Sequence, residues 1–214
     1  MTQSNLYLPY LMEIEKITVE APGVRTFRLK FRNEQEAAAF DFRAGQFGEY
    51  SVFGEGESTF CIASSPTRKG YIECTFRQAG RVTTGLSKLE EGDTVGFRGP
   101  FGNVFPLDEW KGKNLLFIAG GIALPPMRCV IWNVLDTREN FGDVTILYGA
   151  KSVGDLVYKH ELDEWAARPR HDGRSGRRNR RLERPRGLRA IRARTDRSVE
   201  RQYDRNRLRT AGND

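Results

Sequence analysis

The stretch Asn114-Leu-Leu-Phe-Ile-Ala-Gly-Gly-Ile-Ala-Leu-Pro-Pro-Met-Arg128 decides the fold of the second half of this chain. Its apolar run predicts a buried parallel strand, its Gly-Gly pair a tight turn, and the residues that follow a helix. Only glycine lets a backbone approach a pyrophosphate closely, and the first N–H groups of a helix are free to bind it. The pattern therefore predicts a dinucleotide-binding unit, although the same Gly-Gly turn also serves as a plain connector.

Strands and helices are expected to alternate around this stretch. Apolar strands at Leu115–Ala119 and Val144–Tyr148 alternate with helical patterns at Pro125–Leu135 and Asp155–Ala167. A βαβα order predicts a parallel sheet with helices packed on it.

The first hundred residues follow a different period. Short segments with apolar residues at every second position are bounded by Gly, Pro, Asn or Asp, which is typical of an antiparallel barrel or sandwich. One helix, Val82–Leu89, is expected to interrupt them. The expected strands are Leu11–Val19, Val24–Phe31, Gln46–Phe53, Phe60–Ala63, Tyr71–Arg77 and Thr94–Arg98. The chain is thus predicted to be an α+β protein of two domains that join near residue 110.

Charge is distributed unevenly along the 214 residues. The formal net charge of +7 comes from residues 168–214, which hold 17 Arg, no Lys and 6 acidic residues, whereas residues 1–167 are net acidic. Any inference of a polyanionic partner therefore concerns this tail alone. The tail has few apolar residues and is expected to be disordered.

Other features exclude several classes of function. Cys61, Cys74 and Cys129 are widely spaced, which argues against a metal site or a disulfide framework. His160 follows Lys159 on an expected helix and is interpreted as a solvated side chain. With no run long enough to span a bilayer and no signal peptide at the N-terminus, the protein is expected to be cytoplasmic.

Six short motifs occur in the order found in the ferredoxin–NADP reductase superfamily, and the resemblance extends over residues 1–167. The motifs are Phe42–Phe47, Ser58–Pro66, Gly80–Leu86, Arg98–Gly102, Gly120–Pro126 and Tyr148–Ser152. The resemblance implies an FAD-binding β-barrel domain over 1–108 and the N-terminal half of a doubly wound NAD(P)-binding domain over 109–167. Residues 168–214 form the Arg-rich tail.

The resemblance also implies the roles of individual residues. Phe60 would stack on the isoalloxazine ring, Cys61 would lie beside its redox-active nitrogen, and Thr83 would bind the pyrophosphate; the alternative is that Phe60 and Cys61 are ordinary barrel core. Two residues depart from the pattern: Ser58 replaces the family's phosphate-binding Arg, a role that Arg81 is expected to take, and Ala123 replaces a glycine. The expected cofactor-binding residues are Ser58, Thr59, Phe60, Cys61, Ile62, Ala63, Gly80, Arg81, Val82, Thr83, Thr84, Gly120, Gly121, Ile122, Ala123, Pro125, Tyr148, Gly149 and Lys151. No catalytic side chain or metal ligand is expected, because the flavin performs the chemistry.

The implied activity is electron transfer between NAD(P)H, as substrate, and a partner subunit through FAD. The opening Tyr7–Tyr10 and the Phe60–Pro66 version of the flavin motif resemble the gamma or FAD/NAD(P) subunits of cytoplasmic hydrogenases, sulfite reductases and heterodisulfide reductase-linked complexes. Those branches continue into a Cys-Gly-Pro-Pro motif and four cysteines that hold a 2Fe-2S cluster, and neither motif occurs here. The alternatives are a non-functional truncated fragment and a polyanion or nucleic-acid binder that uses the Arg-rich tail; no specific nucleic acid is expected as partner.

A one-base slip of the reading frame near Pro169-Arg170 accounts for the tail. Codons for Gly187–Ile191, read one base late, admit Gly-Phe-Val-Pro, and those for Leu208–Asp214 admit Cys-Gly-Pro-Pro-x-Met. We therefore hypothesise a one-base shift of the reading frame, which is either a sequence error or a real frameshift.

Overall fold

The computed structural model describes residue 5 and residues 7–167. The first unit contains the strands β1 (Tyr10–Ala21), β2 (Val24–Phe31), β3 (Phe47–Val52), β4 (Gly56–Cys61), β5 (Ile72–Arg77) and β6 (Thr94–Phe101), and the helices α1 (Glu34–Ala39) and α2 (Arg81–Leu86). The second unit contains the strands β7 (Leu115–Gly120) and β8 (Val144–Gly149) and the helices α3 (Leu124–Asp136) and α4 (Leu162–Ala167). Short 3₁₀ helices are η1 (Leu107–Trp110), η2 (Gly121–Ala123), η3 (Arg138–Asn140), η4 (Val153–Asp155) and η5 (Lys159–Glu161).

The first unit is an antiparallel barrel, as the sequence predicts. Its six described strands run in the order β4-β3-β6-β1-β2-β5. The barrel closes where the two edge strands meet, because the amide of Ala63, just past β4, donates a hydrogen bond to the carbonyl of Glu73 on β5 at 2.7 Å. Inward-facing side chains such as Met12, Phe27 and Phe97 are fully buried and fill the interior.

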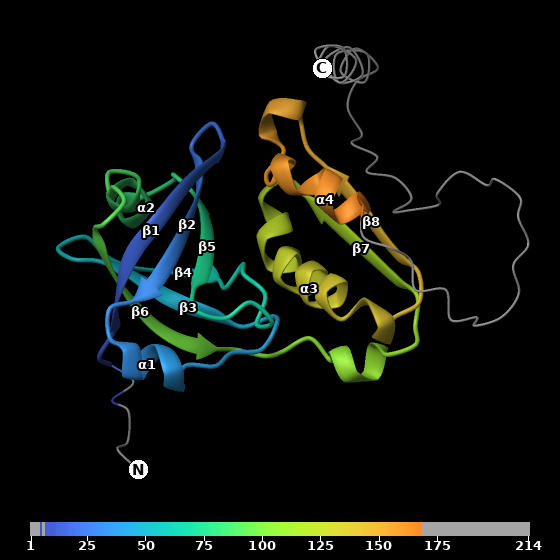
Figure 1. Ribbon diagram of the computed structural model, residues 1–214. Coiled ribbons are helices and arrows are strands. Elements are labelled where there is room, and N and C mark those ends of the chain that lie inside the picture. The colour runs from blue at the N-terminus through green and yellow to red at the C-terminus, as the bar shows by residue number, and fades with distance from the viewer. Residues whose placement is uncertain (1–4, 6, 168–214) are drawn as a thin grey trace, which may run out of the picture.

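The second unit is a parallel pair of strands covered on one face. β7 and β8 pair in register from Leu115 and Val144 to Gly120 and Gly149, and α3 lies between this sheet and the barrel (Figure 1). Its core contains Trp132 and also includes Ala21, Val24 and Ala44 of the first unit. The two units therefore share one apolar interface.

The helix expected over Asp155–Ala167 is wrong in its first half. Val153–Asp155 and Lys159–Glu161 form 3₁₀ turns, and only Leu162–Ala167 is α-helical. Between the turns Tyr158 adopts φ 55°, a left-handed conformation that is rare outside glycine. Its amide donates to Oε2 of Glu20 on β1 at 2.8 Å, and its hydroxyl is hydrogen-bonded to that of Thr75 on β5. These tertiary bonds interrupt the helix despite its apolar period.

Two further local expectations need correction. The flavin strand was expected over Phe60–Ala63 but spans Gly56–Cys61, because a tight turn at Gly54 returns the chain from β3 earlier than the pattern indicates. Helix α1 was not expected at all. Its signal is nevertheless in the sequence: Asn33 caps it by accepting hydrogen bonds from the amides of Gln35 and Glu36.

Candidate functional site

Strand β4 places the two residues expected around the isoalloxazine ring. Gly48 and Tyr50 of β3 are the cross-strand partners of Phe60 and Ser58, so these four residues share the inner side of the barrel. Phe60 is half-buried, and its ring centroid lies 5.8 Å from that of Tyr50 and 5.9 Å from that of Phe76. Its ring is therefore both part of the barrel packing and partly accessible.

Cys61 occupies the opposite side of β4 by strand alternation. Its side chain is only half-buried in terms of exposed surface, and burial in its surroundings raises the pKa of the thiol to about 12. The thiol therefore stays protonated at neutral pH, so it is a weak hydrogen-bond donor and not a nucleophilic thiolate. Thr59, on the same side, donates its hydroxyl hydrogen to Glu49 at 2.8 Å, while Ile62 and Ala63 are buried.

The turn into α2 is held by its own threonine. Thr83 is buried, and its hydroxyl oxygen accepts hydrogen bonds from the amides of Ala79 and Gly80 at 2.9 and 2.8 Å. The same hydroxyl donates to the carbonyl of Gly80 at 3.0 Å. Thr83 thus orders the backbone of the expected phosphate turn, a role that pattern reasoning missed.

Arg81 is the exposed cation of this turn. Its guanidinium lies 2.7 Å from the Glu55 carboxylate and donates to the carbonyl of Gly54 at 2.9 Å. Val82 is half-buried beside Gly56, and Thr84 is also half-buried. The turn between β3 and β4 therefore fixes Arg81 close to the start of β4.

The Gly120–Pro126 loop, which is expected to bind the nicotinamide and is named the nicotinamide loop, is built from the end of β7, η2 and the start of α3. Gly121 has φ 51°, the left-handed region that favours glycine, and Ile122 and Ala123 complete the turn. Pro125 lies in the first turn of α3, where its missing N–H leaves no hydrogen bond unmade. Tyr148 supports the loop from β8, because its hydroxyl donates to the carbonyl of Gly121 at 3.0 Å.

The carboxyl ends of the two parallel strands meet at this loop. Gly120 and Gly149 are register partners at the last step of the sheet, and Lys151 is exposed just beyond. A Cβ built on Gly80, Gly120, Gly121 or Gly149 would meet no protein atom within 4 Å. Both expected phosphate turns thus leave backbone open to a ligand, and Arg81 supplies a cation at the first, so the residues present fit a flavin dinucleotide and a nicotinamide dinucleotide.

The structure brings the two halves of the site together along β4. The start of the strand lies against α2, since the nearest atom to a Cβ on Gly56 would be that of Val82 at 3.5 Å. The other end reaches the second unit: Nη1 of Arg128 on α3 donates to the carbonyl of Ala63 at 3.0 Å. One strand therefore runs from the expected phosphate turn to the element that carries the nicotinamide loop.

Sequence reasoning missed a buried polar cluster at this junction. Arg128 is ion-paired with Glu73 on β5 and Glu161 on η5, each at 2.5 Å. Burial opposes ionisation of Glu73, but the adjacent guanidinium groups of Arg128 and Arg28 outweigh it and lower the pKa of its carboxyl. A single arginine within the apolar pattern of the predicted helix was the available signal.

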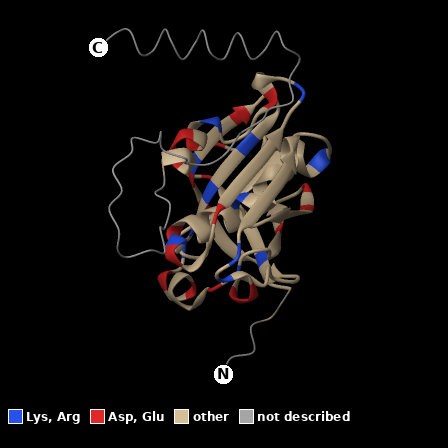
Figure 2. Cartoon of the chain, turned by 90° about the vertical axis from the view of Figure 1, so that its right-hand side faces the viewer, with Lys and Arg blue, Asp and Glu red and all other residues tan. Residues whose placement is uncertain are grey.

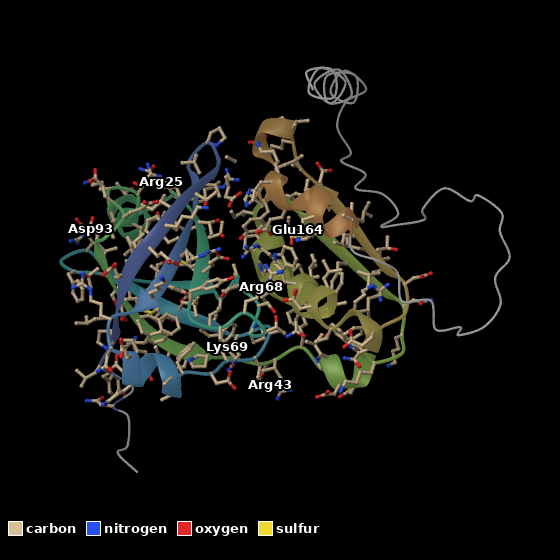
Figure 3. The ribbon with its side chains drawn as sticks, in the orientation of Figure 1. Arg25, Arg43, Arg68, Lys69, Asp93 and Glu164 are labelled. Carbon is tan, nitrogen blue, oxygen red and sulfur yellow. The ribbon has the colours of Figure 1, made fainter. Side chains whose placement is uncertain are left out.

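Figure 3 shows Arg68 at the boundary between the two units. It forms a bidentate pair with Asp136 at the end of α3, with N–O distances of 3.0 and 3.1 Å. Its guanidinium carbon also lies 3.6 Å from a ring centroid of Trp132. In the view of Figure 2, basic and acidic residues are interspersed along the described part of the chain.

The described residues hold no cluster of three or more His, Cys, Asp or Glu that could bind a metal. None of the helices in the described ranges is long and apolar enough to cross a membrane.

Two family models match the chain in the order of its two units. The oxidoreductase FAD-binding domain matches residues 11–105, and the oxidoreductase NAD-binding domain matches residues 117–184. The second match continues past residue 168, where the composition changes. These matches define the class: a two-unit oxidoreductase with a flavin-binding barrel and a nicotinamide-dinucleotide-binding α/β unit.

Curated relatives include a sulfhydrogenase gamma subunit and a probable electron transfer subunit. The chain is 38% identical over 163 residues to sulfhydrogenase 1 subunit gamma of Pyrococcus furiosus, covering 76% of this chain and 56% of that protein. It is 29% identical over 156 residues to the probable dihydroorotate dehydrogenase B (NAD(+)) electron transfer subunit of Methanocaldococcus jannaschii, covering 73% and 53%. The chain spans about half the length of these relatives.

Solved structures share the fold. Phthalate dioxygenase reductase aligns with a TM-score of 0.63 and 21% identity, covering 74% of this chain and 49% of that chain. The FAD/NAD-binding domain of nitric oxide dioxygenase from Vibrio cholerae aligns with a TM-score of 0.64 and 17% identity, covering 73% and 69%. The chain therefore carries the oxidoreductase FAD-binding and NAD-binding domains, and it shares its fold with these solved structures.

Proposed function

We propose that this chain is the flavin- and nicotinamide-binding part of an electron-transfer reductase that moves electrons between NAD(P)H and a redox partner. The observation that carries the proposal is the course of β4, which links the α2 turn, with its open backbone at Gly80, to the Arg128 side of the nicotinamide loop. The family matches to FAD- and NAD-binding domains support it.

When bound, FAD would supply the redox chemistry that couples hydride exchange with the nicotinamide to single-electron exchange with the partner. The residues of the chain would bind the cofactor and orient it. Arg81 and the Gly80 turn would hold the pyrophosphate, with Thr83 ordering that turn, and Phe60 would present an aromatic face to the ring. The Cys61 thiol, protonated at neutral pH, would offer a hydrogen bond without a competing charge.

The nicotinamide substrate would bind at the Gly120–Ala123 turn. The methyl group of Ala123 is exposed, so its replacement of the family's glycine leaves the turn intact. Lys151, exposed beyond the end of β8, is proposed to contact a ribose or its phosphate. A comparison of NADH with NADPH, before and after Lys151→Ala, measures its share of the nucleotide preference.

The proposed partners are other subunits of a hydrogenase-, sulfite reductase- or heterodisulfide reductase-type complex in the cytoplasm. The curated relatives include subunits of such assemblies, among them the gamma subunit of a sulfhydrogenase. The described residues hold no ligand set for the 2Fe-2S cluster that the resemblance implies.

The visible spectrum of the purified chain tests the proposal. Titration with FAD should give a saturable complex with flavin absorbance, and NADH or NADPH should bleach it in a stopped-flow experiment. A chain that stays colourless at saturating FAD would overturn the flavin assignment, while a yellow protein that neither nucleotide reduces would overturn the electron-transfer assignment for residues 1–167.

The predicted disorder of the tail and the proposed frameshift concern residues outside the described ones. The frameshift remains a hypothesis that resequencing of codons 165–175 decides: an uninterrupted frame would reject it. Salt-dependent binding of the chain to a polyanion such as heparin would instead favour the binder alternative.

A further inference from the structure

A charged cluster is buried at the junction of the two units. Arg128, Glu73 and Glu161 are 5%, 5% and 7% exposed. They come from α3, β5 and η5, so one arginine joins the barrel to two elements of the second unit. We name Arg128 with these two carboxylates and the Ala63 carbonyl the Arg128 clasp.

The guanidinium is bonded on three of its nitrogen atoms. Nε and Nη2 donate to the two carboxylate oxygens of Glu161 at 2.8 and 2.5 Å, and Nη1 donates to Glu73 at 2.5 Å and to the carbonyl of Ala63 at 3.0 Å. A planar fork with fixed donor directions tolerates little sliding, whereas apolar surfaces tolerate more. The bonds therefore set the register of α3 against the barrel.

Both carboxylates are held in place by additional donors. Arg28 of β2 donates to Glu73 at 2.9 Å, and the indole N–H of Trp132 donates to Glu161 at 3.0 Å. The guanidinium carbon of Arg128 also lies 4.6 Å from the ring centroid of Tyr158. The clasp is thus a fully bonded network, the condition under which a buried polar cluster specifies one arrangement.

The Arg128 clasp lies between the two halves of the candidate site. Arg128 lies one helical turn after Leu124, the first residue of α3, and Gly120–Ala123 of the nicotinamide loop directly precede Leu124. The Ala63 carbonyl lies two residues past Cys61, the last residue of β4. The hydrogen bond between Arg128 and Ala63 therefore connects the end of β4 directly to the helix that follows the nicotinamide loop.

We propose that Arg128 is a positioning residue that fixes the nicotinamide loop against the end of the flavin strand through Glu73, Glu161 and the Ala63 carbonyl. A role for Arg128 in aligning the nicotinamide with the flavin rests on the proposed function. The clasp itself is a property of the chain with or without FAD, so the two can be tested separately.

The chain offers two spectroscopic reporters that separate its units. Its three tryptophans, Trp110, Trp132 and Trp165, all follow the barrel, whereas bound FAD would report on the barrel. Tryptophan emission overlaps flavin absorption, so energy transfer between them measures the placement of one unit against the other. This readout needs no hydride transfer.

The experiment compares the full chain with the variants Arg128→Met, Arg128→Lys and Glu161→Gln, each loaded with FAD. In the parent chain the thermal transitions of tryptophan fluorescence and flavin absorbance should coincide. In Arg128→Met and Glu161→Gln the tryptophan transition should fall by about 10 °C below the flavin transition, because a buried partner is lost from one unit. Energy transfer at 20 °C, in the folded state, should change in both variants.

The Arg128→Lys variant separates geometry from charge, and a second variant serves as a control. Arg128→Lys keeps the charge but not the fork, so it should recover part of the transition temperature while energy transfer stays altered; a purely structural charge predicts that both return to the parent values. Glu57→Gln is the matched control, since Glu57 forms the same bidentate pair with Arg98 within the barrel. It should leave the two transitions coincident.

Coincident transitions and parent-like energy transfer in Arg128→Lys and Glu161→Gln would overturn the proposal, even if Arg128→Met fails to fold. If the chain binds no FAD, the proposed function fails and the clasp is tested by amide hydrogen exchange. Peptides from β5 and α3 should then lose their common protection in Glu161→Gln but not in Glu57→Gln, and unchanged protection would reject the clasp.

Discussion

The two units of this chain differ in how completely the faces of their sheets are buried by the described residues. The barrel pairs its strands into one closed sheet around a buried core. The β7–β8 sheet is covered by α3 on one face, while Leu116 and Ile118 on the other are 60% and 62% exposed. The barrel can therefore hold its flavin strand by itself, whereas the second unit depends on the barrel for part of its core and for the partners of Arg128.

The largest expected effect comes from the barrel core. Phe97 is fully buried and stacks edge-on against Tyr50, with ring centroids 5.1 Å apart. Phe97→Ala should cost about 3 to 5 kcal/mol of unfolding free energy through lost burial and a cavity. Urea unfolding followed by flavin absorbance measures it. A loss below about 1 kcal/mol would show that the barrel core tolerates large cavities, and would contradict the view that this core stabilises the barrel by itself.

The junction should give the next effect, and it depends on pH. Ionised Glu73 is stabilised by Arg128 and Arg28, so its pKa is lowered in the folded state. A lowered pKa contributes stability that is present above the unfolded value, about 4.3, and is lost as pH falls through the folded value. Glu73→Gln should cost about 3 kcal/mol at pH 7 and less in acid. Unfolding curves from pH 7 to pH 3 for both chains check this; parallel pH profiles would contradict it.

A smaller effect is expected at the α2 turn. Thr83→Ala removes the hydroxyl that binds the amides of Ala79 and Gly80, so it should cost about 0.5 to 2 kcal/mol and weaken FAD binding about 5- to 200-fold, or 1 to 3 kcal/mol. Thr83→Ser keeps the hydroxyl and serves as the control. FAD titration by fluorescence quenching measures the affinity. Equal affinities for the Ala and Ser variants would remove Thr83 from the flavin site.

The smallest effect on stability tests the exposed sheet face. Ile118→Lys should change the unfolding free energy by no more than about 0.5 kcal/mol, since its side chain is largely in solvent. It should nevertheless reduce self-association, because apolar patches on a sheet drive aggregation. Val19→Lys, at 71% exposure on the barrel, is the matched control. Light scattering at raised concentration should fall for the first variant only, and an equal fall in both would refute a special role for this face.

Sequence patterns predicted most of the strands because their signals are local. The period of two in β1 to β6 and the apolar runs of β7 and β8 show which faces are buried, and burial largely fixes register. The Gly-Gly turn before α3 was equally visible, since only glycine adopts the φ of Gly121 without strain. The candidate site residues on these elements remain predictions, and the structure adds how they are held.

The class of each unit and the order of its turns follow from the sequence, because they depend on neighbours within a few positions. Three features follow only from tertiary contacts: the left-handed Tyr158, the early return of the chain into β4, and the pairing of Arg128 with Glu73, 55 residues away. A buried charge or a strained residue is stable only with partners from other elements, and no local pattern specifies those partners.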